Sequence, residues 1–170
     1  MSLTRVLLAL AFVLLLCVNL PAQMLPPAAS TPAFDQLKSL AGSWEGKRSA
    51  DLSAMVTYEV VSNGSVVMER LKAAHEAEMV TMYSLDGGRI VVTHYCSMGN
   101  QPTMQTAPLT AATGKYDFHF VRVAGTKTPD EAHMTDLTLS MPDKDHLTQT
   151  WTFQEKGKSS SESFNFTRAK

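Results

Sequence analysis

Residues 55–73 read Met-Val-Thr-Tyr-Glu-Val-Val-Ser-Asn-Gly-Ser-Val-Val-Met-Glu-Arg-Leu-Lys-Ala. Two runs rich in β-branched and aromatic residues, Met55 to Val61 and Val66 to Ala73, flank the dipeptide Asn63-Gly64. Asn and Gly both tolerate the positive φ that a tight connection between antiparallel strands needs. This stretch therefore predicts a β-hairpin.

The same pattern, short β-rich runs separated by turn residues, continues on both sides of this hairpin. A second hairpin is predicted from Met79 to Leu85 and Arg89 to Cys96, joined by Asp86-Gly87-Gly88. Further β-rich runs recur roughly every eight to twelve residues, as in all-β sandwiches and barrels. These runs are Trp44 to Arg48, Thr103 to Leu109, Lys115 to Val123, Ala132 to Met141, His146 to Gln154 and Ser161 to Arg168.

So many strands in one small domain either stack as two sheets or close on themselves, and closure removes the exposed edges. A short helix is expected before them, because Phe34, Leu37 and Leu40 recur at helical spacing behind Thr31-Pro32 and Gly42 ends the pattern. The predicted fold is therefore all-β, an antiparallel up-and-down β-barrel of about nine or ten strands with a short N-terminal helix.

The N-terminal residues have the order of a secretory signal peptide. Arg5 precedes an apolar run from Val6 to Val18, which is short for a membrane span of about 20 residues. We predict cleavage after Ala22, a flexible leader over 23–32 and one barrel domain over 33–170, exported to the periplasm or out of the cell. No membrane span is expected after cleavage, and a retained anchor is the alternative.

The charge and cysteine content of the chain limit the kinds of binding partner that we expect. The formal net charge is −1 and the charges are interspersed, which favours neither a nucleic acid nor an anionic membrane surface. Cys17 lies in the predicted signal, so Cys96 would be alone in the mature chain, without an intramolecular disulfide. We expect a buried, inert thiol and a monomer or weak dimer.

The entry to the first predicted strand, Leu40-Ala41-Gly42-Ser43-Trp44-Glu45-Gly46, resembles the Gly-x-Trp-x-Gly opening of the calycin superfamily. That superfamily includes lipocalins, fatty-acid-binding proteins and haem-binding nitrobindin-like barrels. The resemblance implies that Trp44 closes one end of the barrel against the helix, that Gly42 and Gly46 let the backbone bend, and that Arg168 packs over Trp44.

Two further features qualify this resemblance. The stretch from Met82 to Met104 is similar to uncharacterised exported bacterial proteins of lipocalin-like type, which brings no known activity. Lys47-Arg48-Ser49 stand where nitrobindin-like proteins have further glycines. This difference argues against haem binding.

The run from Arg89 to Cys96 carries the first candidate site. Alternation places Ile90, Val92, His94 and Cys96 on one face. If that face lines the barrel, His94 and Cys96 look into its interior. The alternative is a structural histidine with a hydrogen-bond partner, beside a buried thiol.

A closed barrel of this size has room for one small apolar ligand, and methionine suits an adaptable pocket. The chain has 10 methionines, several of them on alternating strand positions with aromatic residues. The alternative is that these side chains simply pack as a core. The candidate ligand-binding residues are Tyr58, Met82, His94, Cys96, Phe118, Phe120 and Trp151, with Asn100 and Gln101 at the mouth.

Catalytic and metal chemistry have little support in the sequence. No Gly-x-Ser-x-Gly motif occurs, and His94 and Cys96 would point in parallel rather than at each other. A metal site needs three or four converging ligands, but the other histidines lie on different runs. These histidines are His75, His119, His133 and His146. The carboxylates on the predicted strands and turns are expected to be exposed, namely Glu59, Glu69, Glu76 and Glu78.

The leading hypothesis is a non-catalytic exported barrel that binds a small hydrophobic or amphipathic molecule. One alternative is a haem or metal protein with His94 or His133 as ligand. Another is an envelope structural or interaction module with a filled barrel. A hydrolase is the least favoured option, because a fold alone licenses no reaction.

Overall fold

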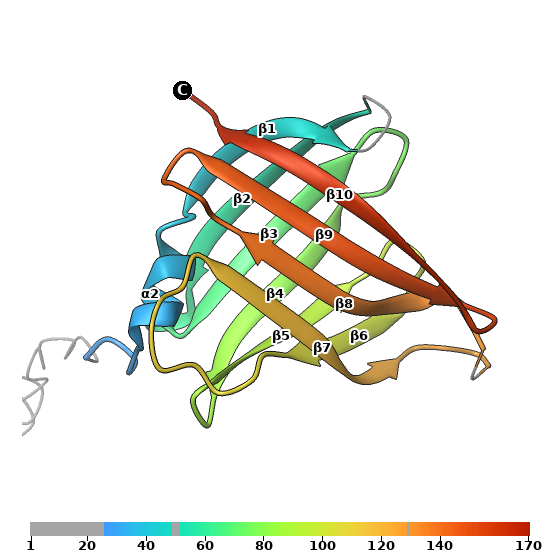
Figure 1. Cartoon of the computed structure of the whole chain (residues 1–170), viewed down its shortest axis with the longest axis horizontal. Helices are drawn as coiled ribbons and strands as arrows, with labels where there is room; N and C mark the ends of the chain where they lie inside the picture. The colour runs from blue at the N-terminus through green and yellow to red at the C-terminus, as the bar shows by residue number, and fades with distance from the viewer. Residues whose placement is uncertain (1–25, 49–51, 129) are drawn as a thin grey trace, which may run out of the picture.

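The barrel is the main feature of the computed structural model, which describes residues 26–48, 52–128 and 130–170. Each strand pairs antiparallel with its neighbour in the chain, and β10 pairs with β1 to close the ring (Figure 1). The predicted fold class is confirmed. The strands are β1 (Gly42–Arg48), β2 (Ser53–Val61), β3 (Val66–Ala73), β4 (Met79–Asp86), β5 (Arg89–Tyr95), β6 (Gln101–Gln105), β7 (Lys115–Ala124), β8 (His133–Ser140), β9 (His146–Glu155) and β10 (Lys158–Arg168).

Two strands differ from their predicted bounds by three or more residues at one end. β6 begins before Thr103 and ends at Gln105, because Pro108 has no backbone N–H for the ladder and the Thr106 hydroxyl instead accepts from Ile90 N. β10 begins at Lys158 rather than Ser161. Lys156 and Gly157 have φ values of 48° and 75°, which make a tight turn and extend the ladder to its base.

Helix α2 (Pro32–Lys38) covers one end of the barrel (Figure 1). Its start is set by Thr31, whose hydroxyl accepts a hydrogen bond from Phe34 N, and by Pro32 in the first turn. The predicted signal peptide, residues 1–22, lies outside the described residues. Within the described part of the chain, no helix is long and apolar enough to cross a membrane.

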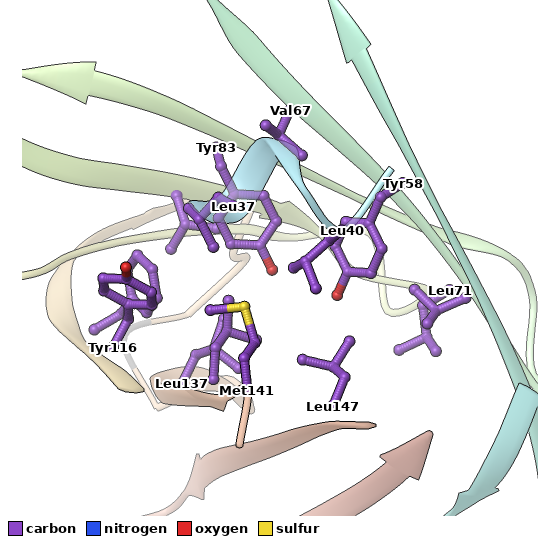
Figure 2. Close-up of a cluster of buried hydrophobic side chains, with 14 of the residues drawn as sticks. Leu37, Leu40, Tyr58, Val67, Leu71, Tyr83, Tyr116, Leu137, Met141 and Leu147 are labelled. Carbon is purple, nitrogen blue, oxygen red and sulfur yellow. The ribbon is translucent and has the colours of Figure 1, made fainter. Parts of the chain in front are cut away.

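Side chains fill the barrel beneath α2 (Figure 2). Leu37 and Leu40 lie beside Tyr58 and Tyr83 there, and aliphatic side chains from β3, β8 and β9 surround them. Tyr116 donates its hydroxyl proton towards this helix, where Gln36 Oε1 lies 2.5 Å away. We call this region the filled end.

The closure between β1 and β10 is part of the filled end. Trp44 is buried, and its indole N–H donates to Leu40 O at 2.8 Å. The Arg168 guanidinium lies over the Trp44 ring, 4.2 Å from its centroid. Gly42 has φ +122°, and a Cβ on Gly46 would clash with the Asn165 carbonyl across the ladder, so only glycine fits where these strands approach.

Candidate functional site

A cavity of about 360 Å³ lies at the opposite end of the barrel from α2, which we call the open end. It lies where β4 and β10 begin and β5 and β9 end. Most of its wall is apolar, with polar side chains gathered on the β10 side and on the segments that follow β3 and β5. The lining residues are Met79, His94, Cys96, Met134, Trp151, Phe153 and Phe164, with Glu76, Ser97, Met98, Ser160, Ser161 and Glu162.

Strand alternation explains which side chains reach the interior. On β5, Ile90, Val92 and His94 are buried while their neighbours are more exposed. On β9, Gln149 and Trp151 are buried in the same way. Because both strands run from the filled end towards the open end, His94 and Trp151, which lie in the second halves of β5 and β9, meet near the open end, with ring centroids 4.7 Å apart.

A buried carboxylate lies between the filled end and the cavity. Glu69 on β3 is 0% exposed, which corrects the expectation that it is an exposed charge. Its Oε2 accepts from the Tyr83 hydroxyl at 2.7 Å and from Gln149 Nε2 at 3.0 Å, and its Oε1 accepts from the Thr81 hydroxyl at 3.2 Å. Glu69 is thus the acceptor on which these donors converge.

Gln149 and Trp151 extend this network to the cavity wall. Trp151 Nε1 donates to Gln149 Oε1 at 3.0 Å, and Gln149 Nε2 lies 2.5 Å from the Tyr58 hydroxyl. An indole N–H is only a donor, so it fixes which end of the Gln149 amide carries oxygen. We call Glu69, Tyr58, Tyr83, Thr81, Gln149, Trp151 and His94 the polar layer.

His94 joins the polar layer to the cavity. Its Nδ1 lies 2.9 Å from the Thr81 hydroxyl oxygen, and the side chain is only 1% exposed. Burial lowers the pKa of His94 from 6.5 to about 4, so the imidazole is neutral near neutral pH. Its Nε2 is buried and has no hydrogen-bond partner among the described residues.

The other titratable groups of the polar layer are shifted by burial as well. Burial raises the pKa of Glu69, while hydrogen bonds from Tyr83, Tyr58, Thr81 and Gln149 act in the opposite direction. Burial, and then the Glu69 charge, raise the pKa of Tyr58 and of Tyr83 well above the usual value. Both phenols therefore keep their protons.

Three charged side chains lie together at the rim of the open end. Arg48, at the end of β1, forms ion pairs with Glu76 and with Glu162, the latter at 2.5 Å between Nε and Oε1. Both carboxylates line the cavity. The arginine is thus engaged by two acidic partners.

The structure brings three predicted ligand-binding residues together at the cavity, namely His94, Cys96 and Trp151. Tyr58 and Phe118 are also buried but lie deeper. Tyr58 belongs to the polar layer, and Phe118 packs edge-on against Tyr83 with ring centroids 6.0 Å apart. A ligand in the cavity would therefore have to enter the polar layer to touch Tyr58, and to cross it to touch Phe118.

The other predicted positions lie outside the cavity. Met82 alternates with the buried Thr81 and Tyr83, so it is on the outer face of β4. Phe120 is 42% exposed and packs against His133, with ring centroids 5.3 Å apart.

The two predicted mouth residues make local contacts instead. Asn100 donates from Nδ2 to Ala132 O at 2.8 Å, and its Oδ1 has no partner among the described residues. Gln101 donates from Nε2 to Gly99 O at 2.8 Å. Neither side chain lines the cavity.

Several site residues were missed in the sequence, and Glu69 and Gln149 are the two that organise the polar layer. A signal existed for Glu69, because Val67, Leu71 and Ala73 are its apolar neighbours at even spacing, while the other face of β3 carries the charged residues Arg70 and Lys72. No comparable signal marks Gln149, which lies in a run of threonines. No group of three or more potential metal-ligating side chains occurs among the described residues.

Comparison with known proteins supports the fold. No protein-family model matches the chain, and no curated protein matches it. The crystal structure of Rv2717c from M. tuberculosis is similar, with a TM-score of 0.61 and 13% identity over 84% of this chain and 100% of that one. At such identity the likeness shows a shared barrel fold.

A protein of unknown function from the DUF3598 family of Nostoc punctiforme PCC 73102 is also similar. Its TM-score is 0.52 at 12% identity, over 85% of this chain and 51% of that one. This chain therefore corresponds to about half of the Nostoc protein, and here too the likeness concerns the fold.

Proposed function

We propose that this chain binds one small hydrophobic or amphipathic molecule in the open-end cavity and performs no chemistry on it. The supporting observation is the mostly apolar cavity wall that includes His94, whose buried Nε2 has no partner. Buried polar atoms in folded proteins are nearly always hydrogen-bonded, so a ligand that pairs with this nitrogen would complete the site.

The size of the cavity supports the same proposal. Its volume of about 360 Å³ is in the lower part of the range found for small-molecule sites, roughly 300–1,000 Å³. Met79 and Met134 contribute flexible side chains to the wall, and Trp151 and Phe153 contribute aromatic ones. Such a wall suits a compact apolar body rather than an extended lipid.

The sequence resemblance adds two parts to the proposal. The Gly42-Ser43-Trp44-Glu45-Gly46 opening, with Arg168 over Trp44, supports membership of the calycin superfamily. The signal-like residues 1–22 support export to the periplasm or out of the cell. The first part rests on the sequence pattern and on the contact between Arg168 and Trp44, and the second on the sequence pattern alone.

The test is a titration of the purified protein with N-phenyl-1-naphthylamine, a neutral apolar probe whose fluorescence increases in apolar binding sites. We expect saturable binding at one site per chain. Met134→Trp should abolish it by filling the cavity, whereas the control Met82→Trp, on the outer face of β4, should leave it unchanged. Equal binding by both variants would place the probe elsewhere and contradict the proposal.

The alternatives from the sequence have no specific observation in their favour. An absorbance scan and native mass spectrometry of the same protein address them directly. A Soret band lost in His94→Ala would indicate haem. A filled barrel would instead take up no probe and show no co-purified mass.

A further inference from the structure

We infer that the head group recognised by His94 is a hydrogen-bond donor, an O–H or N–H, and that a carboxylate head is rejected. This inference rests on the proposed function and specifies its ligand class. It distinguishes the site from one built to bind fatty acids as anions. It follows from the direction of each hydrogen bond in the polar layer.

The first step is the charge state of Glu69. Tyr83, Thr81 and Gln149 donate to its carboxylate, and the Tyr58 hydroxyl is hydrogen-bonded to it as well. Hydrogen bonds to the charged form of a carboxyl favour that form. An ionised Glu69 accepts all of these bonds, so we assign it the negative charge.

The second step is the Thr81 hydroxyl, which has one proton and two neighbours. It lies 3.2 Å from Glu69 Oε1 and 2.9 Å from His94 Nδ1. A carboxylate has no proton to donate, so Thr81 donates to Glu69 and accepts from His94. The network therefore assigns the tautomer of His94 with the proton on Nδ1.

The third step is the free nitrogen. A neutral imidazole protonated on Nδ1 has a lone pair on Nε2 and accepts there. This atom is buried and unpartnered among the described residues. Only a donor can satisfy it, because an acceptor such as a carboxylate oxygen would face it lone pair to lone pair.

The charges around the cavity also disfavour an anionic head group. Among the described residues that line it, none is a lysine or arginine, while Glu76 and Glu162 are both present. Arg48, at the rim, is engaged by these two carboxylates. With Glu69 ionised beneath His94, an anionic head would meet net negative charge and no free cation in this part of the site.

The experiment compares heads on one apolar chain. 1-Octanol and octanoate are titrated as competitors of N-phenyl-1-naphthylamine at pH 7.5, and we expect 1-octanol to bind roughly tenfold more tightly or better. Octylammonium, a second donor head, should also exceed octanoate. His94→Phe should narrow the difference between the affinities of 1-octanol and octanoate while the probe still binds, and the carboxylates of Glu76 and Glu162 should account for the difference that remains.

Glu69→Gln is the sharper variant, because its amide can donate to Thr81. Thr81 would then donate to His94 Nδ1, and the proton of the imidazole would move to Nε2. The preference for 1-octanol should shrink to about equal affinity or reverse in favour of octanoate. An unchanged preference in a folded Glu69→Gln protein would overturn the inferred chain of hydrogen bonds from Glu69 through Thr81 to His94.

The ¹⁵N spectrum of His94 in the wild-type protein tests the tautomer without any ligand. We expect a protonated Nδ1 and an unprotonated Nε2, and the reverse would overturn the inference even if Glu69→Gln fails to fold. Octanoate binding as tightly as 1-octanol would also overturn it and leave the proposed function intact. Failure of the probe and of all competitors to bind would instead refute the proposed function.

Discussion

The two ends of this barrel are built from the same alternating strands but have different contents. At the filled end, Phe34, Leu37 and Trp44 are almost fully buried, and α2 lies across the opening. At the open end, Met134 and Phe153 remain half-buried beside a cavity of about 360 Å³. Inward-facing apolar residues are therefore not enough to fill a barrel, because an added element must cover the end.

Irregular pairing adds to this difference. The register shifts between Thr103 and Met104 on β6 and between Met134 and Asp136 on β8. Bulges of this kind bend a strand and redirect its side chains. The shift after Thr103 lies at the middle of β6 and the shift after Met134 lies in the half of β8 nearer the open end, whereas the ladders at the filled end remain regular in these two strands. The irregular pairing of β8 thus lies beside the cavity, where Met134 contributes to the wall.

The largest expected effect is at the filled end. Trp44→Ala would leave a large cavity. It would also remove the hydrogen bond to Leu40 and the ring over which Arg168 packs. We expect a loss of about 4 kcal/mol in the free energy of unfolding. Chemical denaturation measures it, and a loss below about 1 kcal/mol would show that this end does not hold the fold together.

The next largest effect on the free energy of unfolding comes from His94 in the polar layer and depends on pH. The pKa of His94 is about 4 in the folded protein and near 6.5 when unfolded. Between these values the unfolded chain binds a proton that the folded chain does not, so stability is lost as pH falls, at about 1.4 kcal/mol per pH unit. From pH 6.5 to 5 this amounts to roughly 2 kcal/mol.

His94→Phe should lack this contribution to the pH dependence. Glu69 is present in both proteins, so its opposite contribution largely cancels in the comparison. The measurement is urea denaturation of both proteins at pH 7, 6 and 5. Parallel pH profiles would contradict a buried, neutral His94.

A smaller effect is expected at the closure of the filled end. Arg168 packs over Trp44 and donates to the carbonyls of Ser39, Ala41 and Lys144. Lysine keeps the charge but lacks the planar fork, so Arg168→Lys should cost about 1 to 2 kcal/mol. Thermal unfolding of this variant beside Lys170→Arg, a control at the chain end, would show whether geometry or charge matters.

The smallest effect on stability is expected at the open end. Phe153→Ala removes a half-buried ring from the cavity wall, and we expect a loss below about 1 kcal/mol. Probe affinity should fall several-fold, because the ring is part of the binding wall. A large loss of stability with unchanged affinity would reverse the comparison between the two ends.

Much of the fold could be predicted because its signals are local. Turn residues such as Asn63-Gly64 mark the connections, and alternation in each run places residues on one face or the other. The interior position of His94 follows from Ile90 and Val92 on the same strand. The polar layer could not be predicted in this way, because Glu69 and Gln149 lie 80 positions apart in the chain.

By itself, the sequence determined the strands, their up-and-down order, the capping helix and the inward face of most strands, since each of these depends on neighbours within a few positions. Only the tertiary structure decided the depth of each inward side chain in the barrel. That depth assigns Tyr58 to the polar layer and Trp151 to the cavity wall. It depends on the register of ten strands around a closed ring, because every pairing constrains the next.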